Sequence, residues 1–582
     1  MNTRRSTWGF ASTIATFFLA LGAEAGAAEA AYDVLIRGGQ IYDGTGRPPY
    51  VGDVAIRGDS IAYVGKPRKM SAKKIVEAHG QAVSPGFINM LSHAEESVFV
   101  DGREQSDLFQ GVTLEVMGEG DSMGPLTDSM AVRNTAEQSD IKYPIDWRTL
   151  GQYLAGRERA GISLNIASFV GATTVRDFVL GEDDLQPSAQ QLQQMRILVR
   201  QAMQEGALGV SSALIYAPAT FAKTDELVAL ATESGMCGGI YITHMRSEGD
   251  RLLEAVDETI AIARRSGAPA EIYHLKAGGK SNWPKLDAVI ERVQAARASG
   301  IRISADMYTY TAGGTGLDAV MPPWVREGGL DAWINRLKDP AARARVVKEM
   351  DDEHADYENL YPKAGPDGMI LAAFKNDELK PLTGKSLAEV ARMRHKSPEE
   401  TAMDLVVEDG SRVGVIYFVM SEDNVRKETT LPWMSFGSDE QAAAPEGVFL
   451  KSQSHPRAYG NFAKLLATYV RDDKALTLSD AIHRLTALPA ANLSLKRRGL
   501  LKAGYFADVV VFDPQKIQDH STYARPDQLA TGVSDVLVNG QFALLDSKPT
   551  GAHSGQFVHG RAWLGWNDGG CRSSANEWQW AW

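Results

Sequence analysis

The stretch GIYITHMRSEGDRLLEAVDETIAIARRSGAPAEIYHLKAGG, residues 239–279, contains two short apolar runs separated by one longer amphipathic segment. The runs that end in His244 and His274 have the length and composition of buried strands. Between them, residues 252–267 carry apolar side chains at helical spacing. A strand, a helix and a second strand in this order predict a parallel βαβ unit, which places the chain in the α/β class.

The same alternation continues on both sides, from about Pro85 to about Ala491. Repeated strand–helix alternation is typical of a (β/α)8 barrel, so we predict a TIM-type barrel over residues 85–491. Active sites of such barrels lie at the carboxyl ends of the strands. The candidate strands are SPGFIN, TLEVM, NIASFV, GVSSAL, GIYITH, EIYHL, RISADMY and WMSFGSD.

Both ends of the chain read as β-structure. Residues 32–46 and 51–65 alternate around Gly/Asp turns, and residues 504–513 and 534–544 are again rich in strand-forming residues. We therefore expect one small β-sandwich built from residues 31–84 and 492–552. Two further segments break the pattern. The charged, helical stretch at 324–420 is predicted to be an inserted lid or subdomain near the barrel mouth. The Trp-rich tail at 553–582 fits none of these modules, and its only suggested role is that of a docking strip.

The first thirty residues resemble an export signal. A basic start is followed by an apolar run over residues 8–22 and by two small-x-small cleavage sites, Ala23-Glu24-Ala25 and Ala28-Glu29-Ala30. The run is shorter than the ~20 residues that span a bilayer, so we expect no membrane span after removal of the signal. Residues 1–30 therefore predict an exported protein, periplasmic or extracellular, and the pair Arg4-Arg5 leaves the general and twin-arginine routes open.

Composition narrows the class of partner. The 582 residues carry a net charge of −12, with 44% hydrophobic and 23% charged residues. An acidic globular chain argues against nucleic acid or an anionic membrane as partner, because phosphate binding needs a concentrated Lys/Arg surface. The two cysteines, Cys237 and Cys571, are too few for a disulfide framework, and the apolar surroundings of Cys237 predict a buried, inert thiol.

Three ionisable residues stand where predicted strands end. His244 and His274 lie thirty residues apart, about one βα unit, so adjacent strands would aim both imidazoles into one pocket. Paired imidazoles suit a divalent metal such as zinc. Asp439, in SFGSDE at the last strand, is placed to take a proton from a metal-activated water.

Several segments follow one another in an order that resembles a known family. They are SPGFINMLSH, QGVTLEVMGEG, GALGVSSALIYAP, YITHMRSEGD, YHLKAGGKSNWPK, ADMYTYTAGGTGL, GSDE, HPRAYGNF and GYFADVVVFDP. Together, from about Tyr32 to Gly551, they resemble the N-acyl-D-amino-acid deacylase (D-aminoacylase) branch of the amidohydrolase superfamily. The resemblance implies the barrel, the β-sandwich, the insertion, and a hydrolase of carbon–nitrogen bonds other than peptide bonds.

The resemblance also implies roles for individual residues. His244 and His274 would be metal ligands, and Asp439 the catalytic acid and base. Lys276, Tyr308 and Arg457 would bind a substrate carboxylate, for which the planar fork of arginine is well suited. The alternative for both cations is a salt bridge to a neighbouring loop.

The chain departs from the family pattern at the metal site. Where the family has Asp-x-His-x-His this chain reads Asn-Met-Leu-Ser-His, so Leu91 replaces one histidine and only His93 remains. A family cysteine is also missing, and Glu119 is the best replacement, with Asp121 as runner-up and a loop-capping role as the alternative. We therefore expect one tightly bound Zn²⁺. His93 would be a weak ligand, or would hydrogen-bond the substrate carbonyl or the attacking water.

A third departure leaves the substrate open. The family usually has a serine where this chain has Gly314. The first hypothesis is hydrolysis of an N-acyl amino acid or a similar small amide with a free carboxylate. The second keeps the fold and the metal but changes the bond to a cyclic amide, dipeptide, carbamate or lactone. The third is a non-catalytic binding protein with a decayed site. The native metal is also open, because a site of two histidines and a carboxylate accepts iron, cobalt or manganese as well as zinc.

Overall fold

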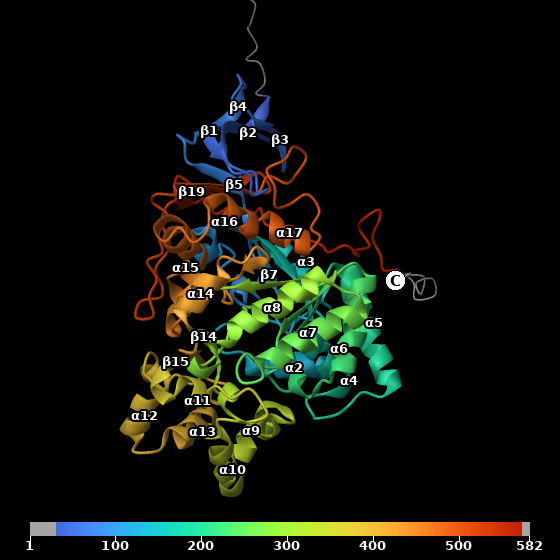
Figure 1. The fold of residues 1–582 in the computed structure, drawn as a ribbon, viewed down its shortest axis with the longest axis vertical. Helices are drawn as coiled ribbons and strands as arrows, with labels where there is room; N and C mark the ends of the chain where they lie inside the picture. The colour runs from blue at the N-terminus through green and yellow to red at the C-terminus, as the bar shows by residue number, and fades with distance from the viewer. Residues whose placement is uncertain (1–30, 573–582) are drawn as a thin grey trace, which may run out of the picture.

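The structure, a computed structural model, describes residues 31–572. The predicted signal peptide at 1–30 and the last part of the Trp-rich tail, 573–582, lie outside the described residues. Three parts follow one another along the long axis in Figure 1: a β-rich part at the top, a central α/β part, and a helical part at the bottom. Among the described residues, no helix combines the length and apolar character needed to cross a membrane.

The central part is built on parallel strands. One six-stranded sheet has the order β17-β13-β12-β11-β10-β9, and a three-stranded sheet has the order β6-β7-β8. Strands β8 and β9 follow each other with one residue between them, and Met90 N donates to Phe436 O at 3.1 Å, which brings β6 beside β17. The strands are β6 (Phe87–Asn89), β7 (Val112–Met117), β8 (Asn165–Ser168), β9 (Val170–Gly171), β10 (Gly209–Ala213), β11 (Ile240–His244), β12 (Ala270–Ile272), β13 (Ile303–Met307) and β17 (Met434–Phe436).

Helices separate these strands in the chain, which confirms the predicted α/β class. Helix α5 begins with a capping box in which Ser188 and Gln191 exchange hydrogen bonds, as a polar residue before an apolar period predicts. Consecutive helices pack side by side, and α7 buries one apolar face (Figure 1). The helices of this part are α1 (Gln105–Leu108), α2 (Asp128–Glu137), α3 (Leu150–Ala160), α4 (Ala172–Leu180), α5 (Ala189–Glu205), α6 (Thr224–Met236), α7 (Leu252–Ser266), α8 (Lys285–Ala298), α14 (Glu422–Glu428), α15 (Arg457–Lys464), α16 (Leu478–Leu485) and α17 (Ala487–Asn492).

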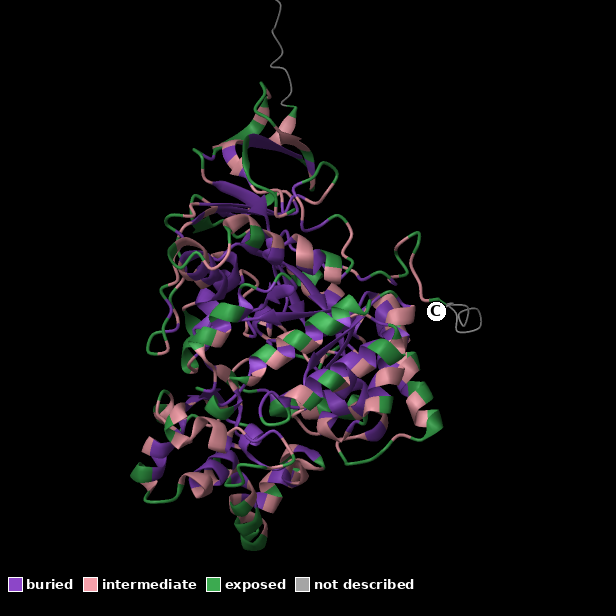
Figure 2. Ribbon diagram, in the orientation of Figure 1, coloured by how far each residue is buried: buried purple, intermediate pink, exposed green. Residues whose placement is uncertain are grey.

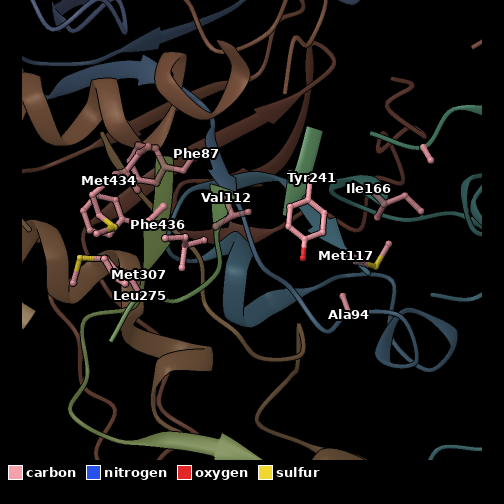
Figure 3. Close-up of a cluster of buried hydrophobic side chains, with 14 of the residues drawn as sticks. Phe87, Ala94, Val112, Met117, Ile166, Tyr241, Leu275, Met307, Met434 and Phe436 are labelled. Atoms are coloured by element: carbon pink, nitrogen blue, oxygen red, sulfur yellow. The ribbon is translucent and has the colours of Figure 1, made fainter. Parts of the chain in front are cut away.

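The parallel strands are buried along their whole length, as the purple centre of Figure 2 shows. Every residue of β7, β10, β11 and β13 is buried, which explains why these strands read as continuous apolar runs. Alternate side chains such as Phe87, Tyr241 and Phe436 join one large apolar cluster with the helices (Figure 3). Rigid, fully packed strands can hold polar groups at their ends in fixed positions.

The two chain ends share one nine-stranded sheet, with the order β21-β20-β19-β18-β5-β1-β2-β3 and β4 paired with β1. Antiparallel pairing of β18 with β5 joins the late strands to the early ones. A separate apolar cluster that includes Ile36, Val54 and Val509 lies on this sheet. Its strands are β1 (Tyr32–Ile41), β2 (Tyr50–Arg57), β3 (Ser60–Gly65), β4 (Ala72–Glu77), β5 (Ala82–Pro85), β18 (Val509–Phe512), β19 (Val533–Val538), β20 (Gln541–Leu545) and β21 (Lys548–Pro549).

Between β13 and β17 the chain forms the helical part at the bottom of Figure 1. It has its own apolar cluster around Trp333, Leu371 and Met403. A small antiparallel sheet, in the order β14-β16-β15, belongs to this part, and Leu371 on β15 and Val415 on β16 contribute to the cluster. The elements are β14 (Gly313–Gly316), α9 (Gly329–Leu337), α10 (Pro340–Met350), α11 (Tyr361–Ala364), β15 (Met369–Ala373), α12 (Leu387–Arg394), α13 (Pro398–Asp409) and β16 (Gly414–Tyr417).

The described part of the tail packs against the parallel strands and corrects one prediction. Val558 N donates to Ile166 O, and the tail runs on to Cys571, which forms a disulfide with Cys237. The prediction of a free, inert thiol at Cys237 was therefore wrong. Because 334 residues separate the two cysteines, no local pattern connects them, and only the packing of the tail brings them together.

Candidate active site

All eight predicted site residues line one cavity of about 820 Å³ at the carboxyl ends of the parallel strands. The wall opposite the strands comes from the helical part and includes Gly314, Thr315, Glu358 and Arg412. The predicted residues in the cavity are His93, Glu119, His244, His274, Lys276, Tyr308, Asp439 and Arg457.

The strand ends position the key side chains through unusual backbone conformations. His244 is the last residue of β11, whereas His274 and Asp439 lie just beyond β12 and β17. His274 has φ = 33° and Asp439 has φ = 53°, both in the left-handed region that side chains other than glycine rarely adopt. Backbone hydrogen bonds hold both residues: His274 N donates to Asp306 Oδ1 at 2.9 Å, and Asp439 N donates to Leu91 O at 2.8 Å. Strain of this kind concentrates at functional sites.

Glu119 lies at the centre of the site. Its Oε1 is 2.8 Å from His274 Nε2 and 3.1 Å from His244 Nδ1, and its Oε2 is 3.3 Å from His93 Nε2. Burial would raise the pKa of Glu119, but the three histidines hold it well below its usual range, so the carboxylate stays ionised.

The arrangement offers ligand atoms for a cation. In each of two groups, Glu119–His244–His274 and His93–Glu119–Asp439, these atoms lie within 4.8 Å of one another, and Glu119 belongs to both. Two imidazoles and a carboxylate are a donor set that zinc accepts, so the residues present fit a metal ion. Asp121 belongs to neither group. Its Oδ1 lies 3.5 Å from Thr174 Oγ1, and burial beside Asp177 raises its pKa to about 6.

Asp439 is flanked by a histidine and an arginine. His93 Nε2 lies 3.1 Å from Asp439 Oδ1, and Arg457 Nη1 lies 2.8 Å from Oδ2. Burial alone would raise the pKa of Asp439, but the charge of Arg457 and the hydrogen bond from His93 bring it below its ordinary value. The His93 side chain is 40% exposed and faces the cavity, so it can also reach a bound molecule.

The other predicted cation, Lys276, is held by Glu248. Lys276 Nζ donates to both carboxylate oxygens of Glu248 at 2.8 Å and lies 2.8 Å from His274 Nδ1. Tyr308 lies between the two cations, with its ring centre 4.4 Å from Arg457 Cζ and 5.6 Å from Lys276 Nζ. Its buried hydroxyl has no hydrogen-bond partner, and the residue lines the cavity. Both cations thus make the salt bridges that were the alternative to substrate binding.

Sequence reasoning missed residues that loops and the helical part contribute. The Tyr216 ring lies edge-on to His244 at 5.4 Å between ring centres, and its hydroxyl is 2.8 Å from Thr315 Oγ1. Arg412 covers the other side of the Tyr216 ring at 4.8 Å. Tyr216 follows a predicted strand end, which could have marked it, whereas nothing in the sequence places Arg412 near the site. Glu248 carried one signal, its spacing of four residues from His244.

This fold and this site define a class of protein. Residues 74–543 match the model of the amidohydrolase family, and the chain therefore belongs to that family. Among its relatives, the D-aminoacylase of Alcaligenes xylosoxydans xylosoxydans is 31% identical over 532 residues, which cover 90% of this chain and 97% of the relative. The N-acyl-D-glutamate deacylase of the same organism is 31% identical over 513 residues, 87% of this chain and 93% of the relative. The resemblance stated from the sequence is confirmed.

Solved structures agree. A D-aminoacylase structure, described for the functional role of its binuclear metal centre, superposes with a TM-score of 0.76 at 30% identity and covers 91% of this chain and 100% of its own. The N-acyl-D-glutamate deacylase of Bordetella bronchiseptica, in complex with zinc and a phosphonate mimic of the tetrahedral intermediate, has a TM-score of 0.75 at 27% identity. It covers 91% of this chain and 99% of its own.

Proposed function

We propose that this protein is a metal-dependent hydrolase of the amide bond in N-acyl amino acids or similar small amides that carry a free carboxylate. The observation that carries the proposal is the shared carboxylate of Glu119, which contacts both strand-end histidines while His93 links it to Asp439. The names of the relatives, D-aminoacylase and two N-acyl-D-amino-acid deacylases, support the substrate class. A small-molecule substrate also suits a cavity of about 820 Å³.

His244, His274 and Glu119 would hold one tightly bound ion, which we propose to be Zn²⁺. When bound, the ion would lower the pKa of a water molecule and polarise the scissile carbonyl. Leu91 stands where the family has a histidine, so one potential nitrogen ligand is missing near the group His93–Glu119–Asp439. This group would therefore hold a second ion only weakly.

Asp439 carries the proton in the proposed reaction. Its low pKa leaves the carboxylate free to accept a proton from the attacking water. As the bond between the water oxygen and the carbonyl carbon forms and the carbon–nitrogen bond breaks, Asp439 passes this proton to the leaving nitrogen. The products are a carboxylic acid and a free amino acid. His93, 3.1 Å from Asp439, orients the carboxylate and reaches the substrate carbonyl from its exposed side.

Arg457, Tyr308 and Lys276 would receive the substrate carboxylate. Tyr308 contributes the unpaired hydroxyl, and burial keeps its pKa well above the usual value, so it remains a hydrogen-bond donor. Arg457 adds positive charge 4.4 Å from the same ring. The clamp would orient the acyl amide with its carbonyl toward Glu119 and Asp439.

Two broader features belong to the proposal. Backbone contacts between β6 and β17, together with the near-continuous β8 and β9, support closure of the parallel strands into the predicted (β/α)8 barrel. The disulfide between Cys237 and Cys571 supports export to an oxidising compartment, as residues 1–30 predict.

The decisive experiment is elemental analysis of the mature protein and of a Glu119→Ala variant, followed by a substrate panel. We expect about one zinc per wild-type chain and little in the variant, with release of amino acids from N-acyl-D-amino acids. A folded wild type that takes up no metal would refute the proposal and favour the binding-protein hypothesis. Activity confined to cyclic or neutral substrates would favour the second hypothesis, which Gly314 supports because it lacks the family's hydroxyl.

A further inference from the structure

Glu248 lies behind the metal-binding histidines and has no role in the steps above. It follows His244 by four residues, on the loop after β11, and is buried. Its Oε1 lies 3.0 Å from His274 Nδ1, and its Oε2 lies 3.8 Å from His244 Nε2. The Glu248 carboxylate therefore faces His274 Nδ1 and His244 Nε2, the two ring nitrogens that point away from Glu119.

The imidazole rings of His244 and His274 present different nitrogens to Glu119. His244 presents Nδ1 to Glu119, and its buried Nε2 has no hydrogen-bond partner, because the 3.8 Å to Glu248 Oε2 is longer than a hydrogen bond. His274 presents Nε2 to Glu119 and directs Nδ1 to Glu248. A neutral imidazole carries one hydrogen, so a ring that offers a lone pair on the Glu119 side must carry its hydrogen on the Glu248 side. An ionised carboxylate has no donor and can accept such a hydrogen, and Glu248 is within hydrogen-bond distance of His274 Nδ1, at 3.0 Å, but not of His244 Nε2.

Lys276 holds Glu248 in place. The ammonium lies 2.8 Å from each carboxylate oxygen. Lys276 Nζ also lies 2.8 Å from His274 Nδ1. His274 Nδ1 can accept a hydrogen bond from Lys276 only if it carries no hydrogen. It can donate a hydrogen bond to Glu248 only if it carries one.

We infer that Glu248 is a positioning residue for the metal site: it selects Nε2 of His274 as the ligand atom by holding the hydrogen of that ring on Nδ1, and Lys276 anchors it. The inference rests on the proposed function only for its metal site. With the hydrogen of His274 on Nδ1, one donor of Lys276 becomes available to a carboxylate beside Tyr308. The same cluster would then serve both metal binding and substrate binding.

The test compares Glu248→Gln with a matched control, Glu358→Gln. Glu358 is also a buried carboxylate and is bonded to the adjacent Ser247, at 2.6 Å, but it contacts no histidine. Zinc affinity is measured by competition with a chromophoric chelator, and ligand geometry by the absorption spectrum of Co²⁺. Because partners behind a ligand typically contribute 10–100-fold in metal affinity, we expect a loss of that size and a changed Co²⁺ spectrum in Glu248→Gln. Glu358→Gln should stay within about twofold of wild type.

The outcomes separate this inference from the proposed function. Wild-type zinc affinity and an unchanged Co²⁺ spectrum in folded Glu248→Gln would overturn the inference alone. Weakened zinc binding without hydrolysis of any acyl amino acid by the wild type would leave the inference standing and refute the proposed substrate class. A wild type that binds no zinc would refute both. If Glu248→Gln fails to fold, Lys276→Met keeps the carboxylate and removes its anchor, and unchanged zinc affinity in that variant would overturn the inference.

Discussion

Arg457 contacts Asp439 at two points: Nη2 donates to the main-chain carbonyl at 2.6 Å, and Nη1 lies 2.8 Å from the side-chain Oδ2. Both residues are buried, so their charges interact with little screening by solvent. Arg457 therefore acts on the proposed acid and base itself as well as on any substrate carboxylate. Loss of the arginine should leave a buried carboxylate without its main counter-charge.

The Arg457→Ala variant should consequently lose more than substrate affinity. Because Arg457 lowers the pKa of Asp439, its removal should raise that pKa. Asp439 must be ionised to accept a proton, so the acid limb of the kcat/KM profile should move to higher pH, and KM should rise. The profile is measured with acyl amino acids, with Arg457→Lys as the control that keeps the charge. An acid limb that stays in place while KM rises would show that Arg457 acts on the substrate only.

The Asp439→Asn variant separates proton transfer from metal binding. Asparagine keeps the shape of the side chain but cannot accept the proton, and general acid–base catalysis contributes about 10²–10⁴-fold. We expect kcat to fall within that range while zinc content stays near that of the wild type. The measurement is kcat beside elemental analysis of the same samples. A variant with nearly full activity would exclude Asp439 from the mechanism.

The strand-end residues could be predicted because strand periodicity marks where parallel strands end. His244, His274 and Asp439 each follow an apolar run, and parallel strands bring such ends together whatever the loops do. Glu119 followed from the family resemblance, which implies a cysteine ligand near this position, and from the ability of a carboxylate to replace a thiolate as a ligand. These four residues needed no knowledge of loop conformation.

The remaining residues depend on non-local packing that a single sequence does not reveal. Arg412 reaches the cavity because the helical part folds back over the strand ends, and Cys571 reaches Cys237 because the tail lies along β8. Glu248 reaches both histidines through a loop, where a spacing of four residues predicts no particular geometry. Such contacts are set by tertiary structure rather than by local pattern.

Gly314 allows a direct test of the substrate carboxylate site. A Cβ at this position would lie 3.3 Å from Arg457 Nη2, so a serine hydroxyl would be placed beside the proposed clamp. One added hydrogen bond contributes about 0.5–1.5 kcal/mol, so Gly314→Ser should lower KM for acyl amino acids by about two- to tenfold. Gly314→Ala adds the carbon without the hydroxyl and should give no gain. Equal KM values in the two variants would place the carboxylate elsewhere.

The disulfide should stabilise the fold without affecting catalysis. Cys237 directly follows helix α6 and precedes β11, whereas His244 is at the carboxyl end of that strand, so the bond is remote from the site. Removing a native disulfide typically costs about 2–5 kcal/mol, and Cys571→Ser should lower the free energy of unfolding by a similar amount. The variant is compared with wild type in denaturant with and without a reductant, and kcat/KM is measured on both. Reductant should destabilise the wild type but not the variant, and equal stability of the two proteins without reductant would contradict the disulfide.

Glu358 should make the stability of the protein depend on pH. Burial raises the pKa of its carboxyl from an ordinary 4.5 to about 7, so the folded chain keeps a proton that the unfolded chain has already released. Stability from this group is complete below about pH 4.5 and is lost as pH rises through about 7. At about 1.4 kcal/mol for each pH unit, the loss is at most about 3 kcal/mol. Glu358→Gln should remove this loss and so be more stable than wild type at pH 8 but not at pH 4.5. Urea unfolding of metal-free protein, with chelator present to exclude the pH dependence of metal binding, measures both. If the free energies of unfolding of wild type and variant changed in parallel between these two pH values, Glu358 would already be ionised in the folded protein at pH 4.5.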